Sequence, residues 1–190
     1  MARTAALDAR RSQLLLVGKR IFSDRAYDAV STEEIAAEAG ISAGLLYHYF
    51  ANKKGFYVAT IRAAADEVVA ATRFPPERSF AEAAPVALGG FLDFIEANAR
   101  LYISLMRGGV GADAEVHAIL DEVRTTLLNR VIDASGVNAT PALRLRLHGW
   151  LGFVEFTSVR WLTHREVSRP ELMVLLVEAL PPAIYAEVLS

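Results

Sequence analysis

Cysteine is absent from this chain of 190 residues, which excludes disulfide bonds and thiolate chemistry. A chain without cysteine suits a reducing compartment, and we expect a cytoplasmic protein. Long apolar runs are also absent, because none approaches the roughly 18 residues that a transmembrane helix needs. Near the N-terminus the apolar stretch covers only residues 14–17, and Lys19 and Arg20 follow it. We therefore expect neither a signal peptide nor a membrane partner.

Groups suited to catalysis or metal binding are few. The four histidines are scattered and lack the spacing of a zinc site. His148 and Glu155 lie seven residues apart, hence on one face of a helix, and are candidates for an acid–base pair. The alternative is that both are satisfied polar residues of a helical bundle or of a pocket wall. Because no nucleophile, metal-ligand cluster or phosphate loop accompanies them, we predict no enzyme, no metal and no cofactor.

One glycine-rich segment invites a nucleotide-binding interpretation. In RGGVGAD (residues 107–113), Gly109 and Gly111, with Ala114 after them, form an imperfect fragment of the dinucleotide-binding fingerprint. That fingerprint requires a preceding strand in a β–α–β unit, and the sequence predicts none at this place. We interpret the segment as a loop between two helices.

Charge is distributed unevenly along the chain, although the net charge is only −2. Residues 1–62 contain nine basic and six acidic residues, a net charge of +3, whereas residues 63–190 contain 11 and 16, a net charge of −5. A basic head and an acidic body are typical of a protein whose first part alone faces nucleic acid. The positive mean hydropathy of +0.28 indicates buried surface, which in a chain of this size includes a candidate oligomer interface.

Apolar residues recur at helical spacing along the chain, and no segment alternates convincingly with a period of two. We therefore predict an all-α fold. Serine or threonine at helix starts, glycine at helix ends and prolines between segments indicate the boundaries. Two interpretations of Pro85 stay open, since it can kink the fifth helix or mark its true start. The expected helices cover residues 8–24, 31–39, 42–50, 52–73, 79–98, 101–106, 113–135, 140–163 and a last segment from 168, broken by Pro181 and Pro182.

The segment STEEIAAEAGISAGLLYHYF (residues 31–50) predicts two short helices joined by a tight turn. Ser31, with the glutamate three residues later, has the spacing of a capping box, and Gly40 can take the left-handed conformation that ends a helix. Ser42 can cap the second helix, in which Leu46 and the phenylalanine four residues later should face inward. The remaining outer surface is the one that a helix-turn-helix places in the major groove of DNA.

The runs YDAVSTEEIA (residues 27–36) and AGISAGLLYHYFANKKGFY (residues 39–57) resemble the N-terminal domain of the TetR family of bacterial repressors. The resemblance implies a three-helix helix-turn-helix DNA-binding domain over residues 1–62 and a helical-bundle domain for ligand binding and dimerisation over residues 63–190. The family usually has glycine where this chain has Ala26, and a left-handed alanine there would cost about 1 kcal/mol. The most specific part of the resemblance is an aromatic cluster with an amide and a cation after it, Tyr47, Tyr49, Phe50, Asn52 and Lys53.

Contacts to the DNA backbone follow from the resemblance. In the family, the tyrosine at the position of Tyr47 and the lysine at the position of Lys53 contact the backbone. The alternative for Tyr47 is that it only packs the corner between two helices. Thr32 matches a position that contacts a phosphate or a base.

Base reading has fewer candidates in this recognition helix. His48 is its main polar residue, whereas Ala and Leu side chains can only touch thymine methyl groups. Glu33 can accept from a cytosine amino group or simply face solvent. We therefore expect part of the sequence preference to come from DNA shape. The predicted DNA-binding residues are Ser31, Thr32, Glu33, Ser42, Ala43, Gly44, Leu45, Tyr47, His48 and Lys53.

The segment WLGFVEFTSVRWL (residues 150–162) predicts a helix that is apolar on most sides and therefore buried on most sides. Gly149 and Gly152 would permit the close approach of another helix. Together with the run LMVLLV (residues 172–177), this helix is the predicted homodimer interface, and the family resemblance implies a four-helix seam at that place. The alternative is that both helices form the core of a monomer.

A ligand pocket is predicted from aromatic and deformable side chains of the fifth, sixth and eighth helices. The expected effector is small and apolar or amphipathic, with one polar end such as a carboxylate that Arg100 would bind. The competing interpretation is that these aromatic residues are packed core. The predicted ligand-binding residues are Phe94, Arg100, Tyr102, Met106, Trp150, Phe153 and Phe156.

These observations predict a ligand-responsive dimeric regulator of transcription. We expect a repressor that binds an inverted repeat in double-stranded DNA and is released by its effector. One alternative is a constitutive DNA-binding dimer without an effector. Another is a small-molecule-binding protein or enzyme with a vestigial helix-turn-helix.

Overall fold

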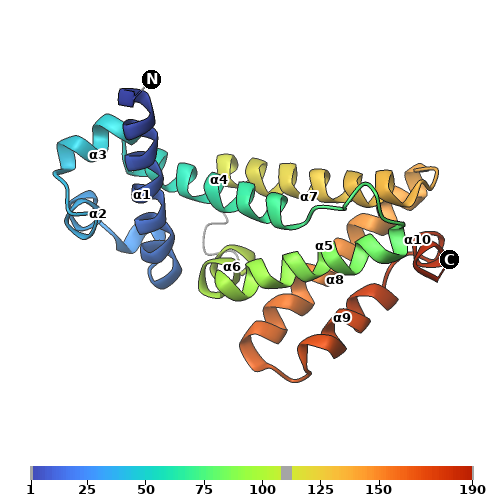
Figure 1. Cartoon of the computed structure of the whole chain (residues 1–190). Coiled ribbons are helices and arrows are strands. Elements are labelled where there is room, and N and C mark those ends of the chain that lie inside the picture. The colour runs from blue at the N-terminus through green and yellow to red at the C-terminus, as the bar shows by residue number, and fades with distance from the viewer. Residues whose placement is uncertain (1, 108–112, 190) are drawn as a thin grey trace. The chain divides into compact units, whose positions relative to one another are not determined.

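The computed structural model describes residues 2–107 and 113–189 (Figure 1). Within these ranges the chain is helical and has no strand, so the predicted all-α fold is confirmed. Across the same ranges, no helix is both long and apolar enough to cross a membrane. The loop predicted from RGGVGAD lies largely outside the described residues. The helices are α1 (Ala2–Asp24), a 3₁₀ turn (Tyr27–Ala29), α2 (Thr32–Glu38), α3 (Ala43–Phe50), α4 (Lys53–Ala71), α5 (Phe80–Ala97), α6 (Ala99–Met106), α7 (Ala114–Ser135), α8 (Pro141–His164), α9 (Arg169–Glu178) and α10 (Pro182–Leu189).

The chain divides into two compact units. The first, here called the head unit, contains Met1–Asp66 and Arg100–Ile119. The second, the body unit, contains Glu67–Ala99 and Leu120–Ser190. Helices α4 and α7 contribute residues to both units, so neither unit corresponds to a single stretch of sequence.

The core of the head unit is aromatic. Phe56 is fully buried, and its ring lies edge-on to that of Phe50 with 5.0 Å between centroids. Phe22 from α1 lies edge-on to Tyr57, with 4.7 Å between centroids. At Gly18 a β-carbon would stand only 2.4 Å from the Thr60 hydroxyl oxygen. Glycine therefore sets how closely α1 approaches α4.

Helix ends in the head unit follow the local sequence. The Ser31 hydroxyl oxygen accepts from the backbone N–H of Glu34, and the Glu34 carboxylate accepts in return from Ser31, as predicted. The hydrogen bonds from the Ser31 backbone and side chain, with a further one from Arg25, lower the pKa of Glu34 to about 2. Gly40 has φ of +64°, the predicted left-handed helix end. Ala26 is extended, with φ of −62°, so it carries no left-handed strain.

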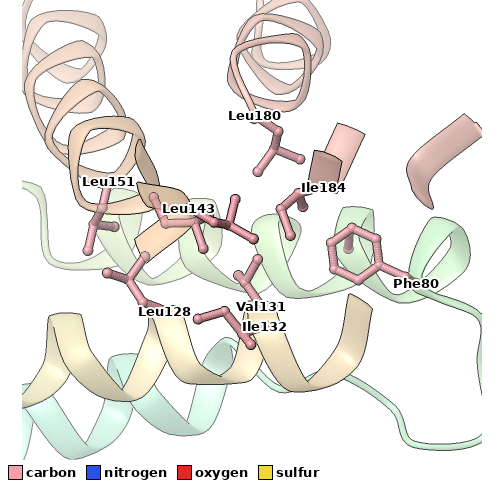
Figure 2. Close-up of a cluster of buried hydrophobic side chains, with 10 residues drawn as sticks. Phe80, Leu128, Val131, Ile132, Leu143, Leu151, Leu180 and Ile184 are labelled. Carbon is pink, nitrogen blue, oxygen red and sulfur yellow. The ribbon is translucent and has the colours of Figure 1, made fainter. Parts of the chain in front are cut away.

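The core of the body unit gathers side chains from α5, α7, α8 and α10 (Figure 2). Leu147 and Ile184 are completely buried in this cluster, and Phe80 packs at its edge. At Gly90 a β-carbon would lie 2.1 Å from the Ala71 carbonyl oxygen, so α5 passes directly against the end of α4. The cluster consists of Phe80, Ala84, Leu128, Val131, Ile132, Leu143, Leu147, Leu151, Leu180 and Ile184.

Prolines of the body unit occur both inside a helix and at the start of one. Pro85 lies inside α5, which begins at Phe80 behind a Ser79 capping box, so it does not mark the start of that helix. The expectation of one last helix broken by Pro181 and Pro182 is corrected. A further helix, α10, begins at Pro182, because the first position of a helix needs no backbone N–H donor.

Candidate functional site

The recognition helix α3 presents one face outward. Leu46 and Phe50 are buried, as predicted from their spacing. Leu45 and Tyr47 expose 40% and 45% of their surface, which is high for large apolar side chains and leaves both available to a partner. The other outward residues of the predicted set are Gly44 and His48, while Ala43 is half-buried.

Hydrogen bonds tie the predicted contact residues to the scaffold. The Tyr47 hydroxyl donates to the Thr32 hydroxyl oxygen at 3.4 Å, which links α3 to α2. Ser42 accepts from the Leu45 backbone N–H at 3.2 Å and so caps α3. Thr32 itself is buried, with 9% of its surface exposed, so its hydroxyl orients Tyr47. The exposed Glu33 stands beside it on α2.

Two adjacent lysines at the start of α4 differ in their surroundings. The Lys53 ammonium lies 4.2 Å from the centroid of the Tyr27 ring, a cation–π contact that holds it at the helix N-terminus. The Lys54 ammonium instead pairs with Asp113 at 3.3 Å and Glu115 at 2.8 Å. The hydrogen bonds to these carboxylates raise the pKa of Lys54. Only Lys53 therefore keeps its charge free of carboxylates and suited to a phosphate.

The sequence did not single out Tyr27 as a functional residue. Its ring centroid lies 5.0 Å from that of Tyr57, and the ring also contacts the Lys53 ammonium. The tyrosine belongs to the run YDAVSTEEIA, so the family motif was the available signal. Its pairing with a lysine 26 positions later depends on the tertiary fold.

An apolar cavity with a volume of about 70 Å³ lies inside the body unit. Its polar lining residue is Thr72, whose hydroxyl is already engaged because it donates to the Val68 carbonyl at 2.7 Å. The Trp150 indole N–H donates to the Leu176 carbonyl at 2.9 Å, so its polar edge also has a partner. The lining residues are Thr72, Phe74, Phe80, Ala84, Ala87, Leu88, Phe91, Leu127, Val131, Trp150, Leu151, Val154, Val177 and Leu180.

Among the predicted ligand-binding residues, Trp150 lines this cavity and the others lie elsewhere. Phe153 and Phe156 are exposed on the outer face of α8, at 42% and 75%. Arg100 pairs with Asp24 of α1, within the head unit. Three residues complete the set: Phe94 is half-buried on α5, while Tyr102 is buried and Met106 half-buried on α6. The structure does not gather these six residues around the cavity.

The candidate acid–base residues are not paired with each other. Glu155 accepts from Arg124, with Nε–Oε1 at 2.8 Å and Nη2–Oε2 at 3.2 Å, and this contact raises the pKa of Arg124. His148 is exposed on α8. Among the described residues, no group of three or more histidine or acidic side chains could hold a metal ion. The partner of the Glu155 carboxylate is thus Arg124, and not His148.

Two family models match the chain. One, for bacterial regulatory proteins of the tetR family, matches residues 14–60. The other, for a tetracyclin repressor-like C-terminal domain, matches residues 82–181, more than half of the chain. The chain belongs to the TetR family.

Individual TetR-family proteins resemble this chain to different degrees. A regulator from Streptomyces coelicolor is 30% identical, with a TM-score of 0.81 over 95% of this chain and 87% of that one. FadR from Bacillus subtilis, solved in complex with stearoyl-CoA, is 15% identical, with a TM-score of 0.70 over 91% of this chain and 97% of its own, which concerns the fold alone. The transcriptional activator FasR from Mycolicibacterium smegmatis is 29% identical over 66% of this chain, and the match spans 58% of FasR.

This TetR-family chain also exposes an apolar strip on α8. Leu145 and Phe156 are 74% and 75% exposed and lie on one helical face with Gly149 and Gly152. A β-carbon at either glycine would meet no atom within 4 Å. Exposed Val174 and Leu175 add apolar surface on α9.

Proposed function

We propose that this protein is a ligand-responsive DNA-binding regulator of transcription. The observation that carries the proposal is the combination of an outward recognition face on α3 with an apolar cavity in the body unit. The protein binds its operator as a homodimer and is released by a small, largely apolar molecule. Residues 1–62 serve as the DNA-binding domain and residues 63–190 as the domain for ligand binding and dimerisation.

DNA binding rests on two kinds of contact. Lys53 and Tyr47 hold the DNA backbone, while His48 and the outer residues of α3 face the bases. Because a homodimer has two-fold symmetry, the operator is an inverted repeat whose half-sites lie one helical turn apart, about 34–36 Å in unbent DNA.

Lys53→Ala is expected to weaken binding to operator and random DNA alike. The change removes one phosphate partner, so the slope of log K against log salt concentration should become less steep by about one. His48→Ala should instead reduce the ratio of operator to random-DNA affinity. Lys54→Ala is the matched control, because its ammonium is paired with carboxylates and the slope should stay unchanged. Fluorescence anisotropy across a salt series measures DNA affinity for all three variants. Equal salt slopes for Lys53→Ala and Lys54→Ala would contradict the assignment of a phosphate contact to Lys53 alone.

The homodimer interface is formed by the exposed apolar strip of α8 together with α9. Gly149 and Gly152 leave room for a partner helix, and Phe156 supplies a large apolar side chain that is otherwise in water. Obligate dimer interfaces are apolar in this way. The proposal agrees with the pairing expected from the family.

Phe156→Glu is expected to convert the dimer to a monomer, because two carboxylates would have to be buried at the two-fold interface. Analytical ultracentrifugation at micromolar concentration measures the mass. Leu16→Glu, at a residue of α1 that is 59% exposed and distant from the strip in sequence, is the control and should remain dimeric. A dimeric Phe156→Glu variant would place the interface elsewhere.

The ligand class follows from the cavity lining. Side-chain polar groups at the wall are already hydrogen-bonded, so the enclosed part of the ligand needs no polar atoms. A fatty acyl chain has this character, and the stearoyl-CoA bound to FadR supports the same class. The earlier assignment of a ligand carboxylate to Arg100 is not retained, since Arg100 pairs with Asp24.

The small volume of the cavity connects binding to conformational change. Pockets that enclose small molecules usually measure about 300–1,000 Å³, well above the 70 Å³ present here. A ligand must therefore displace the walls, and it stabilises the widened state. If the widened state binds the operator less well, the ligand weakens DNA binding by the same factor by which DNA weakens ligand binding.

The test is release of DNA by a defined probe. Operator fragments are selected from a random duplex pool with the purified protein, and their affinity is measured with and without stearate and stearoyl-CoA. For an allosteric effector, operator affinity is expected to fall by about 5- to 150-fold.

The small cavity also favours a second candidate function, that of a constitutive DNA-binding dimer. Unchanged affinity with both probes would favour it.

A further inference from the structure

A second hollow lies at the turn between α4 and α5, within the body unit. It has a volume of about 640 Å³ and is lined by both polar and apolar groups, unlike the apolar cavity beside it. We call it the arginine cleft, after the three arginines in its wall. Its lining residues are Arg73, Phe74, Pro75, Pro76, Arg78, Ala83, Arg130, Asp133 and Ala134.

The arginine cleft has an excess of positive charge. Its lining contains three arginines and one acidic residue, Asp133. Arg130 is fixed in place, because its Nη1 donates to the carbonyl oxygens of Val69 and Thr72 at the end of α4, at 3.3 Å for Thr72. Arg73 and Arg78 are exposed, and within the part of the chain that the structure describes their guanidinium groups make no hydrogen bond or ion pair. Their charges are therefore available to an anion.

The arginine cleft adjoins the apolar cavity. Phe74 lines both, and its ring stacks on Phe80, with 5.8 Å between centroids and 6° between planes. Arg73 and Arg130 of the cleft directly follow and precede, in sequence, cavity residues Thr72 and Val131. One molecule can therefore place an apolar chain beyond Phe74 and a charged group on the arginines.

We propose that the arginine cleft binds the phosphorylated head group of an amphipathic effector whose acyl chain enters the cavity. Guanidinium groups bind phosphate oxygens through paired, charge-assisted hydrogen bonds, which suits them to a head group that carries several phosphates. A volume of about 640 Å³ exceeds what a lone carboxylate needs and lies in the range of pockets for drug-sized groups. The inference rests on the proposed function, since it names the second half of the same ligand.

The test compares three probes by isothermal titration calorimetry on the full-length protein: stearoyl-CoA, stearate and coenzyme A. Stearoyl-CoA should bind at least about tenfold more tightly than stearate, because the phosphates add charge-assisted hydrogen bonds. In the double variant Arg73→Ala, Arg78→Ala this advantage should disappear, and stearate, which offers the same arginines only one carboxylate, should lose less affinity than stearoyl-CoA. Arg130 is left intact because it also caps α4. The control is Arg144→Ala, an exposed arginine of α8 outside the cleft, which should bind like the wild type.

The outcomes separate this inference from the proposed function. If stearate and stearoyl-CoA bind with equal affinity and both release operator DNA, the proposed regulatory function is supported and the proposed head-group site is wrong. If neither probe binds, both the head-group site and the acyl ligand class are wrong. Operator affinity without a probe should be unchanged in the double variant. A loss there would assign the arginines to DNA phosphates and overturn the proposal.

Discussion

Phe56→Ala is expected to destabilise the head unit by about 3–5 kcal/mol, the usual cost of truncating a buried phenylalanine. The Phe56 side chain is fully buried and its ring contacts those of Phe22 and Phe50. Phe50 is the last residue of the recognition helix α3. The loss is comparable with the whole stability of a small domain, so operator binding should fail with it.

Thermal unfolding followed by circular dichroism, with operator binding measured in parallel, checks this expectation. Leu16→Ala is the control, because Leu16 lies in the same unit but is 59% exposed and should change stability by less than about 0.5 kcal/mol. Ligand binding, which uses body-unit residues, should survive in both variants at temperatures where the body remains folded. A Phe56→Ala protein that melts like the wild type would show that the head core is organised differently.

Gly90→Ala and Gly89→Ala are expected to have opposite effects on stability. Both residues lie inside α5, where alanine is favoured over glycine by about 1 kcal/mol. At Gly89 the new methyl group meets only the end of the Met173 side chain at 3.9 Å, so the variant should be more stable. At Gly90 it would stand 2.1 Å from the backbone carbonyl oxygen of Ala71. The forced shift of α5 should cost about 1–3 kcal/mol or more.

Urea denaturation of the two variants measures the difference directly. A backbone carbonyl cannot rotate away as a flexible side chain can, so the cost at Gly90 cannot be relieved locally. The shift acts on the end of α4 beside Thr72, a cavity-lining residue, so Gly90→Ala should also alter ligand affinity. Equal stability of the two variants would mean that α5 and α4 do not pack as closely as described.

Features that depend on neighbouring residues were predictable from the sequence. The capping boxes that begin at Ser31, Ser79 and Ser168 are all present, because each needs only residues three apart. The helix-turn-helix was recognisable for the same reason, since its motif is contiguous. The all-α fold followed from the helical period repeated along the chain.

The cavity was not predictable in this way. Leu88, Leu127 and Val177 line it, yet aliphatic side chains at such positions look the same whether they fill a core or border a void. The exposure of Phe156 was not predictable either, since hydrophobicity alone does not distinguish a core residue from one on the surface. Arg100 looked available for a ligand because its partner, Asp24, lies 76 positions earlier in the chain.

The outward face of α3 has a consequence for how this regulator can change over generations. Gly44, Leu45 and His48 lie outside the packed core, whereas Leu46 and Phe50 anchor the same helix. Substitutions at exposed positions usually alter stability by less than about 0.5 kcal/mol. New operator preferences can therefore be sampled by mutation while the protein stays above its folding threshold. The separation makes α3 a tolerant starting point for directed evolution of orthogonal genetic switches.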